Sequence, residues 1–147
     1  MAGSSGFFWT RFSPYFLSIL RIVTAFLYMQ HGGEKLLGFP SSPAHLSLIS
    51  PDHMLTLVPG LAGLLELGGG FLILLGVFTR PIAFILSGEM AFAYFMAHFP
   101  VNHAFPILNG GSDAVAFCFT FLFLSAAGGG PWAVERLWKR EPEFAAH

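Results

Sequence analysis

Charged residues are scarce in this chain. Asp, Glu, Lys and Arg together make up 10% of its 147 residues, whereas an ordinary soluble domain carries about 25%. So few charges cannot cover a surface that faces water. The formal net charge is −1 and no basic run occurs, so nucleic-acid binding has no electrostatic support.

Cysteine is almost absent as well. Cys118 is the single cysteine and lies in an apolar segment. Without a CxxC pair, the chain cannot be a thiol–disulfide oxidoreductase that uses its own cysteines. No dinucleotide-binding, iron–sulfur, H-x₃-H or HExxH motif occurs, so we expect no metal site, no intrinsic cofactor and no stand-alone dehydrogenase. Haem is left open because its axial histidines need no local motif.

What the chain has in abundance is hydrophobic sequence, at 54% of residues and a mean hydropathy of +0.67. A membrane-spanning helix needs roughly 20 mostly apolar residues. Four segments approach this length, at about 14–31, 57–78, 81–99 and 112–127. The sequence therefore predicts an all-α integral membrane protein, a bundle of four transmembrane helices within residues 14–127.

The basic residues predict the orientation, because Lys and Arg are enriched on the cytoplasmic side. Most of them fall in the N-terminal tail 1–13, the turn near Arg80 and the C-terminal tail 128–147. Both termini are therefore expected in the cytoplasm of a bacterium, with a multi-pass chain in the inner membrane. The loops 32–56 and 100–111 would face outward, and a short interfacial helix is expected at 43–49.

Polar residues inside the spans are the candidate functional residues, since such groups must face protein or water. The first span carries a stripe of them on one arc of about 80°, provided that the helix reaches its last member: Arg21, Thr24, Tyr28, His31 and Lys35. In the second span, Glu66 shares its face with Gly63 and Gly70, which allows another helix to approach closely.

Arg21, Glu66 and Glu89 are all expected near the midplane, roughly 13 to 15 Å below the outer surface. One guanidinium between two carboxyl groups would reduce the cost of burying them. The carboxyl group in excess would then hold a proton at neutral pH. Two interpretations stay open, a structural ion pair that pins the helices and a catalytic site that exchanges protons or binds a ligand.

A second group of polar side chains is predicted at the outer mouth of this site. Its members are Tyr28, His31, Lys35, His98, Asn109 and Asp113. His98 follows Glu89 by nine residues, which puts the two on opposite faces of a straight helix. A proton relay between them would therefore need a break in the helix before Pro100.

These segments together resemble the DoxX family of small four-helix bacterial membrane proteins. The elements are "LRIVTAFLYMQHGGEKLLGF", "GLLELGGGFLILLGVFTRPIA", "AHFP" and "NGGSDA", of which the second is the most specific. The resemblance covers about residues 20–127 and reaches Arg21, His31, Lys35, Glu66, Arg80 and His98. It implies a membrane subunit linked to thiosulfate:quinone oxidoreduction or to redox complexes that handle thiol and oxidative stress.

The leading hypothesis is therefore a membrane subunit of a quinone-linked oxidoreductase, with quinone or quinol above Arg21, Glu66 and Glu89. Its expected partners are the lipid bilayer and a soluble or membrane redox protein that carries the electrons. Whether the chain is catalytic by itself and whether it forms homo-oligomers stay open. The rival hypotheses are a small proton-coupled transporter and a non-catalytic scaffold that recruits a soluble oxidoreductase.

Overall fold

The computed structural model describes residues 4–40 and 57–138, apart from the side chains of 4–8 and 57–59. These two stretches contain helices and no strands. The elements are α1 (Ser4–Leu37), α3 (Leu57–Leu64), η1 (Leu65–Gly69), α4 (Gly70–Leu75), α5 (Thr79–Ala93), η2 (Tyr94–His98), α6 (Ser112–Ala127) and α7 (Glu135–Trp138). Here η denotes a π-helix, in which the backbone hydrogen bonds join residues five apart instead of four.

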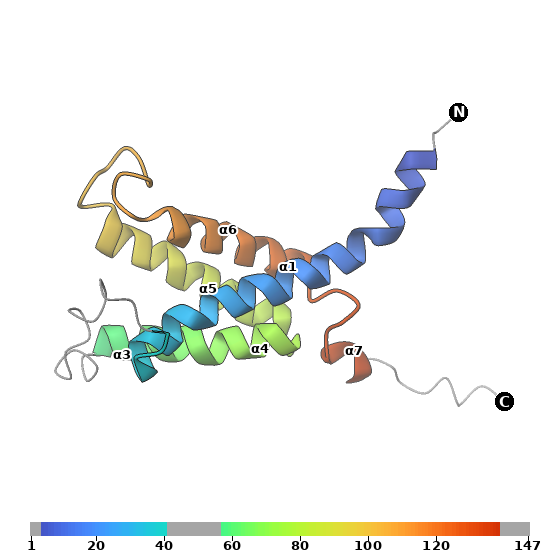
Figure 1. Cartoon of the computed structure of the whole chain (residues 1–147), viewed down its shortest axis with the longest axis horizontal. Coiled ribbons are helices and arrows are strands. Elements are labelled where there is room, and N and C mark those ends of the chain that lie inside the picture. The colour runs from blue at the N-terminus through green and yellow to red at the C-terminus, as the bar shows by residue number, and fades with distance from the viewer. Residues whose placement is uncertain (1–3, 41–56, 139–147) are drawn as a thin grey trace.

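The first helix is much longer than the predicted first span. α1 has 34 residues, which corresponds to about 51 Å at 1.5 Å per residue. It contains Pro14, and its N-terminal part bends away from the other helices, as Figure 1 shows. At the other end α1 continues past His31 to Leu37, so the polar stripe lies on one helix as far as Lys35.

The second and third helical segments each contain a π-helical turn. α3, η1 and α4 follow one another without a break, and so do α5 and η2. Gly76 ends α4 in the left-handed conformation, at φ +73°, which glycine adopts without a steric penalty. α5 begins three residues later at Thr79, and α6 covers 112–127 as the sequence predicted.

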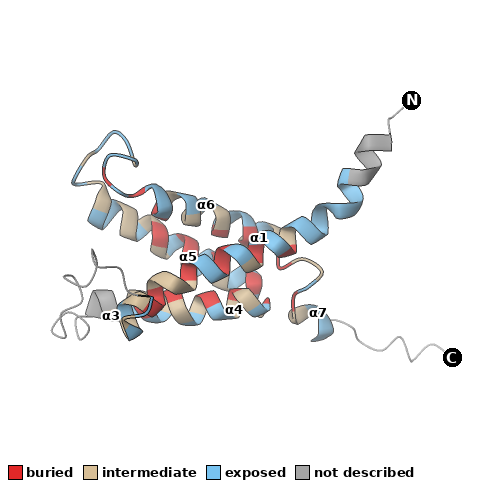
Figure 2. Ribbon diagram, viewed as in Figure 1, coloured by how far each residue is buried: buried red, intermediate tan, exposed pale blue. Residues whose placement is uncertain are grey.

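The helices form two pairs. α1 packs against the α3–η1–α4 segment, α5 packs against α6, and the contacts between the two pairs are fewer. Figure 1 shows the pairs close together at the ends of α4 and α6 and diverging toward α3 and the loop after η2. Figure 2 shows the buried residues gathered between the helices. This core includes Tyr28, Ile73, Leu86, Phe121 and Leu124.

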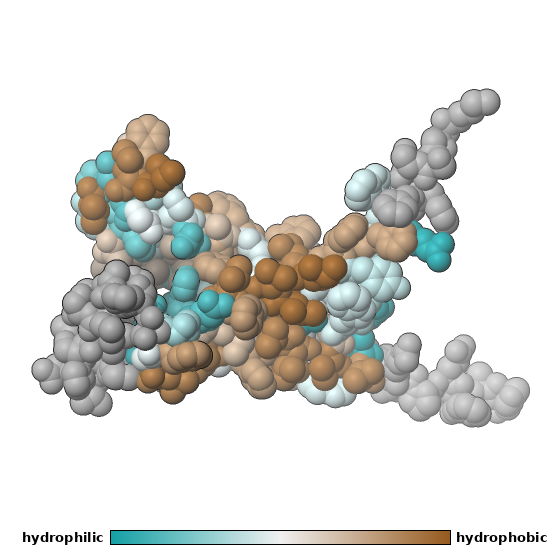
Figure 3. All heavy atoms as spheres, viewed as in Figure 1, coloured by the Kyte–Doolittle hydropathy of each residue, from teal (hydrophilic) through white to brown (hydrophobic). Residues whose placement is uncertain are grey.

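The outer surface of the bundle is strongly apolar. Large side chains such as Val23, Phe26, Phe84 and Phe119 are at least half exposed, and Figure 3 shows a broad hydrophobic face over α1 and α4. By length and composition, Trp9–Leu37 is a candidate membrane span, while Gly60–Leu75 and Ser112–Ala127 are shorter apolar helices. Such a surface suits lipid rather than water.

Part of the predicted C-terminal tail is folded onto the bundle. The backbone N–H groups of Val134 and Glu135 donate to the carbonyls of Leu75 and Gly76. The Glu135 carboxylate also accepts from the backbone N–H of Thr79, at 3.1 Å, at the start of α5. Segment 128–138 therefore closes one end of the helical pairs. The predicted interfacial helix at 43–49 lies outside the described residues.

Candidate functional site

The expected convergence of Arg21 on Glu66 and Glu89 is wrong. Arg21 is completely buried, yet its guanidinium donates to four backbone carbonyls and to no carboxylate. Nε donates to Gly129 at 2.8 Å, Nη2 to Trp132 at 3.1 Å, and Nη1 to two residues at the end of α4. The carbonyl acceptors are those of Ile73, Leu74, Gly129 and Trp132.

The error arose from the depth assigned to Arg21. The predicted depth takes His31 as the outer end of the first span, but α1 continues to Leu37. Arg21 therefore lies beside the last turn of α4. The final carbonyls of a helix lack partners within the helix and carry the negative end of its dipole, so a guanidinium with five donors satisfies them well. Arg21 joins α1, α4 and segment 128–132.

Glu66 has a different cation, Lys35. Lys35 Nζ lies 2.6 Å from Glu66 Oε1. The Glu66 side chain is only 2% exposed, while the Lys35 side chain is 43% exposed, so the pair connects the interior to the surface. Both residues were identified from the sequence, but Lys35 was assigned to the mouth of the site rather than to the carboxylate itself.

Close packing of glycine brings Lys35 and Glu66 together. A Cβ atom placed on Gly32 would lie 2.8 Å from the carbonyl oxygen of Gly63 and 2.9 Å from the carbonyl carbon of Glu66, so only glycine fits at this contact. Gly63 in turn faces Lys35 and Leu36. The predicted role of small residues on the Glu66 face is therefore confirmed.

Glu89 is held from α1 by Tyr28, whose hydroxyl donates to Glu89 Oε2 at 2.7 Å. Tyr28 is fully buried, and its ring packs on Phe117 and Phe121 of α6 with centroids 5.3 and 4.8 Å away. These contacts fix the position of the hydroxyl. Tyr28 thus belongs to the centre of the site and not to its mouth.

The two pairs form one cluster. Glu89 is close enough to Glu66 and Lys35 for both to act on it electrostatically. Each carboxyl group uses one oxygen in a hydrogen bond, while Glu66 Oε2 and Glu89 Oε1 are buried and have no partner among the described residues. A buried polar atom without a partner costs about 1 to 3 kcal/mol. The cluster of Lys35, Glu66, Glu89 and Tyr28 therefore has two acceptor atoms left for a proton or a ligand.

His31 and His98 make their contacts elsewhere, with Phe117 and Asn109 respectively. His31 is half-buried, and its ring makes an edge contact with Phe117 at 5.6 Å. His98 ends η2, a π-helical turn that continues α5 without a break. Its Nδ1 lies 3.0 Å from the backbone oxygen of Asn109, so His98 is tied to the loop before α6.

Asn109 organises the loop between η2 and α6. It is buried, donates to the carbonyl of Asn102 at 2.9 Å and accepts from the backbone N–H of Gly111 at 2.8 Å. Asp113 lies in the first turn of α6 and is exposed. Asn109 and Asp113 therefore have a structural and a surface position, respectively, in the described part of the chain.

The arrangement defines a class of protein, a helical membrane protein with buried ionisable groups between two helix pairs. Comparisons with known proteins agree. The model of the DoxX family matches residues 16–99, and this chain belongs to the DoxX family.

Two relatives extend the similarity over most of the chain. An uncharacterised protein of Haemophilus influenzae is 42% identical over 127 residues, which are 85% of this chain and 92% of the relative. The protein named inner membrane protein YqjF of Escherichia coli is 29% identical over 126 residues, 81% of this chain and 88% of the relative. No solved structure matches the chain.

Proposed function

We propose that this chain is a multi-pass protein of the bacterial inner membrane and the quinone-binding subunit of a redox system. Its family, a relative named as an inner membrane protein and the apolar surface of the helical pairs support the location. The distribution of basic residues supports four spans with both termini in the cytoplasm.

The observation that carries the proposal is the pair of unpartnered carboxyl oxygens at Glu66 and Glu89. Buried ionisable groups in a membrane protein are functional candidates by default. A quinone has two carbonyl acceptors and a quinol two hydroxyl donors. The cluster offers both complements: Lys35 has N–H donors beyond the one given to Glu66, and each of the two carboxyl groups has an acceptor oxygen left.

Access to the cluster would come from the side where the helical pairs diverge. Figure 3 shows hydrophilic side chains gathered there, between α1 and α5. Lys35 is partly exposed while Glu66 is not, so the ion pair leads inward from this region. A ring with an apolar tail could bind there with its tail in lipid.

Conversion of a bound quinone to quinol takes up two electrons and two protons. In the proposed mechanism Glu89 passes a proton to one ring oxygen, and Glu66 passes to the other the proton that it takes from the Lys35 ammonium, while the Tyr28 hydroxyl holds Glu89 in place. Lys35 and Glu89 are then reprotonated from the side on which Lys35 is exposed. The electrons come from a redox centre of a partner protein, because the described side chains include no electron carrier.

The test is quinone binding by purified protein in lipid nanodiscs, titrated with a short-tailed ubiquinone analogue. Glu66→Gln and Glu89→Gln should each weaken binding about tenfold or more, since each removes a charge-assisted acceptor from a buried site. Asp113→Asn is the matched control, because Asp113 is exposed on α6, and it should bind as the wild type does. Absence of binding by wild type, or equal binding by all three variants, would disprove the proposal.

A further inference from the structure

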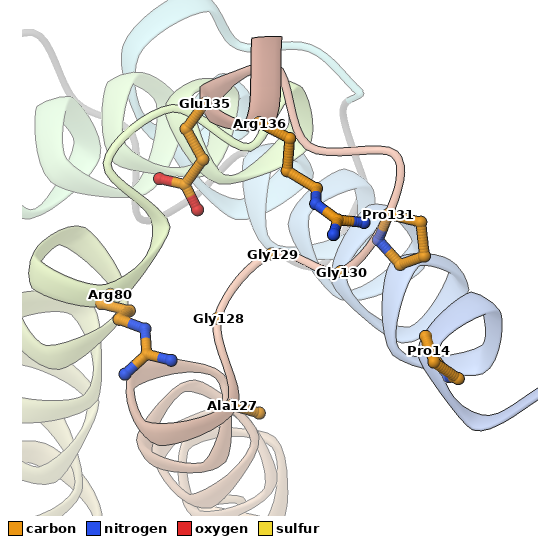
Figure 4. A pocket seen from close by; sticks show the side chains of 9 residues that line it. All are labelled: Pro14, Arg80, Ala127, Gly128, Gly129, Gly130, Pro131, Glu135 and Arg136. Atoms are coloured by element: carbon orange, nitrogen blue, oxygen red, sulfur yellow. The ribbon is translucent and has the colours of Figure 1, made fainter. Parts of the chain in front are cut away.

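A second polar site lies at the opposite end of the bundle from the acidic cluster. It is a cavity of about 280 Å³ lined by the glycine segment 128–130, Pro14, Arg80, Glu135 and Arg136. Figure 4 shows Arg80 and Arg136 on opposite sides of the glycine segment, with their guanidinium groups reaching toward the space beside it. None of these groups takes part in the proposed quinone chemistry.

The cavity carries excess positive charge. Glu135 is already engaged, since its Oε2 accepts from the backbone N–H of Thr79 at the start of α5. Neither Arg80 nor Arg136 forms an ion pair with a carboxylate of the described residues. Two guanidinium groups around a small opening can bind a phosphate with several charge-assisted hydrogen bonds.

Glycine shapes one wall of the cavity. Gly128 has φ +85°, and a Cβ atom on it would lie 3.3 Å from Arg80 Nε. The Arg80 side chain therefore lies along bare backbone. Gly130 has φ +75° and packs against Ser18, so the segment turns sharply and stays clear of the opening. A side chain at either position would strain the backbone.

The surroundings of the cavity indicate that the phosphate belongs to a lipid. Three exposed aromatic residues, Phe78, Trp132 and Trp138, lie near it in sequence and structure. Phe78 contacts Trp138 with ring centroids 6.0 Å apart, and Trp132 contacts Tyr15 at the same distance. Tryptophan and tyrosine mark the depth of the headgroups, and basic pockets on the cytoplasmic side bind anionic headgroups.

We infer that the Arg80–Arg136 cavity binds the phosphodiester headgroup of an anionic phospholipid. The inference goes beyond the proposed quinone chemistry and depends only on the membrane location. Arg80 and Arg136 would contact the phosphate oxygens, while the acyl chains lie along the apolar face of the neighbouring helices. A soluble phosphate ester has the same phosphate chemistry, but its binding would not explain the exposed aromatic residues Phe78, Trp132 and Trp138 beside the cavity.

The experiment is native mass spectrometry of the full chain, released from detergent that contains equal amounts of phosphatidylglycerol and phosphatidylethanolamine. Wild type should retain phosphatidylglycerol preferentially. The double variant Arg80→Gln/Arg136→Gln should lower this preference about tenfold or more, because each arginine near anionic lipid contributes on the order of 1 kcal/mol. The variant Arg80→Lys/Arg136→Lys should retain part of the preference, since it keeps both charges.

Arg11→Gln is the matched control, since Arg11 is an exposed arginine of α1 that does not line the cavity. It should retain the wild-type preference. Size-exclusion chromatography identifies any variant that fails to fold. If the glutamine pair does not fold, the lipid preference of Arg80→Lys/Arg136→Lys tests the inference instead. No preference in wild type, or an equal loss in Arg11→Gln, would overturn the inference. Millimolar inorganic phosphate could instead raise the unfolding temperature of wild type but not of Arg80→Gln/Arg136→Gln. That result, together with no preference of wild type for phosphatidylglycerol, would overturn the lipid assignment.

Discussion

Two polar regions follow one another along α1, and they differ in how completely their hydrogen bonds are made. Arg21 is fully buried and has carbonyl acceptors for all three guanidinium nitrogens. In the cluster around Tyr28, about two turns further on, one oxygen of Glu66 and one of Glu89 have no partner in the described part of the chain. Buried charged groups that contact the same helix, α1, thus differ in whether all of their polar atoms have partners.

The difference separates a structural role from a functional one. A buried charge whose nitrogens all donate to backbone carbonyls holds its neighbours in one arrangement. A buried carboxyl group with a free oxygen is costly unless something else binds it. The structure therefore favours structural pinning at Arg21, whereas the proposed chemistry belongs to Glu66 and Glu89.

The strongest way to break this comparison is to remove Arg21. Arg21→Met should lower the free energy of unfolding by about 3 kcal/mol or more, because several buried carbonyls lose a charged donor. We expect a large fall in the yield of monodisperse protein and in the midpoint of thermal unfolding in detergent. Arg11→Met, at an exposed position, should change neither, and wild-type stability of Arg21→Met would contradict the structural role.

Removing the cation from the acidic cluster should have the next largest effect. Lys35→Met leaves the Glu66 carboxyl group buried without its partner, which should cost about 2 kcal/mol, less than for a completely buried pair. The double variant Lys35→Met/Glu66→Gln should recover part of this lost stability, since it no longer buries the unpaired Glu66 carboxylate. Thermal unfolding of wild type, both single variants and the double variant gives the coupling energy. A double variant less stable than Lys35→Met would contradict the ion pair.

The close approach that forms the ion pair can be tested through two glycines. Gly32→Ala should cost about 1 to 3 kcal/mol, because its Cβ would lie 2.8 Å from the carbonyl oxygen of Gly63. Gly68→Ala is the control, since no atom lies within 4 Å of a Cβ there; it should be neutral or stabilising by up to about 1 kcal/mol. Equal thermal shifts for the two variants would show that α1 does not pack here as described.

The smallest expected effect comes from Tyr28→Phe. This change removes the hydrogen bond to Glu89 but keeps the ring between Phe117 and Phe121, so it should cost about 1 kcal/mol. Tyr15→Phe is the control, because Tyr15 is exposed. Thermal unfolding measures stability, and the quinone titration should show weaker binding for Tyr28→Phe alone. Unchanged binding would remove Tyr28 from the proposed site.

Much of the helical organisation was readable from the sequence. α6 occupies the predicted residues because the glycines at 110–111 and 128–130 bound an uninterrupted apolar run. The residues from Arg21 to Lys35 lie on one helix, and the 3.6-residue period places them on one face of it. The close packing near Glu66 followed from the glycines beside it. The family resemblance, drawn from the same segments, is confirmed.

The partners within the stripe were not readable in the same way. Arg21 binds backbone carbonyls, and a carbonyl belongs to every residue, so no sequence pattern marks it as a partner. The continuation of α1 to Leu37 also puts Arg21 about two turns deeper than its predicted position, relative to the end of its helix. One feature of the sequence does indicate the Lys35–Glu66 pair. Lys35 is the second cation of the polar stripe on α1, and it packs against Gly63, one turn before Glu66.

By itself the sequence determined that this chain forms apolar helices, which of their faces carry the polar groups, and to which family it belongs, because periodicity and composition are local properties. Only the tertiary structure decided that Arg21 holds the carbonyls at the end of α4 while Lys35 and Tyr28 hold the two acids. That choice depends on the register between antiparallel helices, which glycine contacts far apart in the sequence determine.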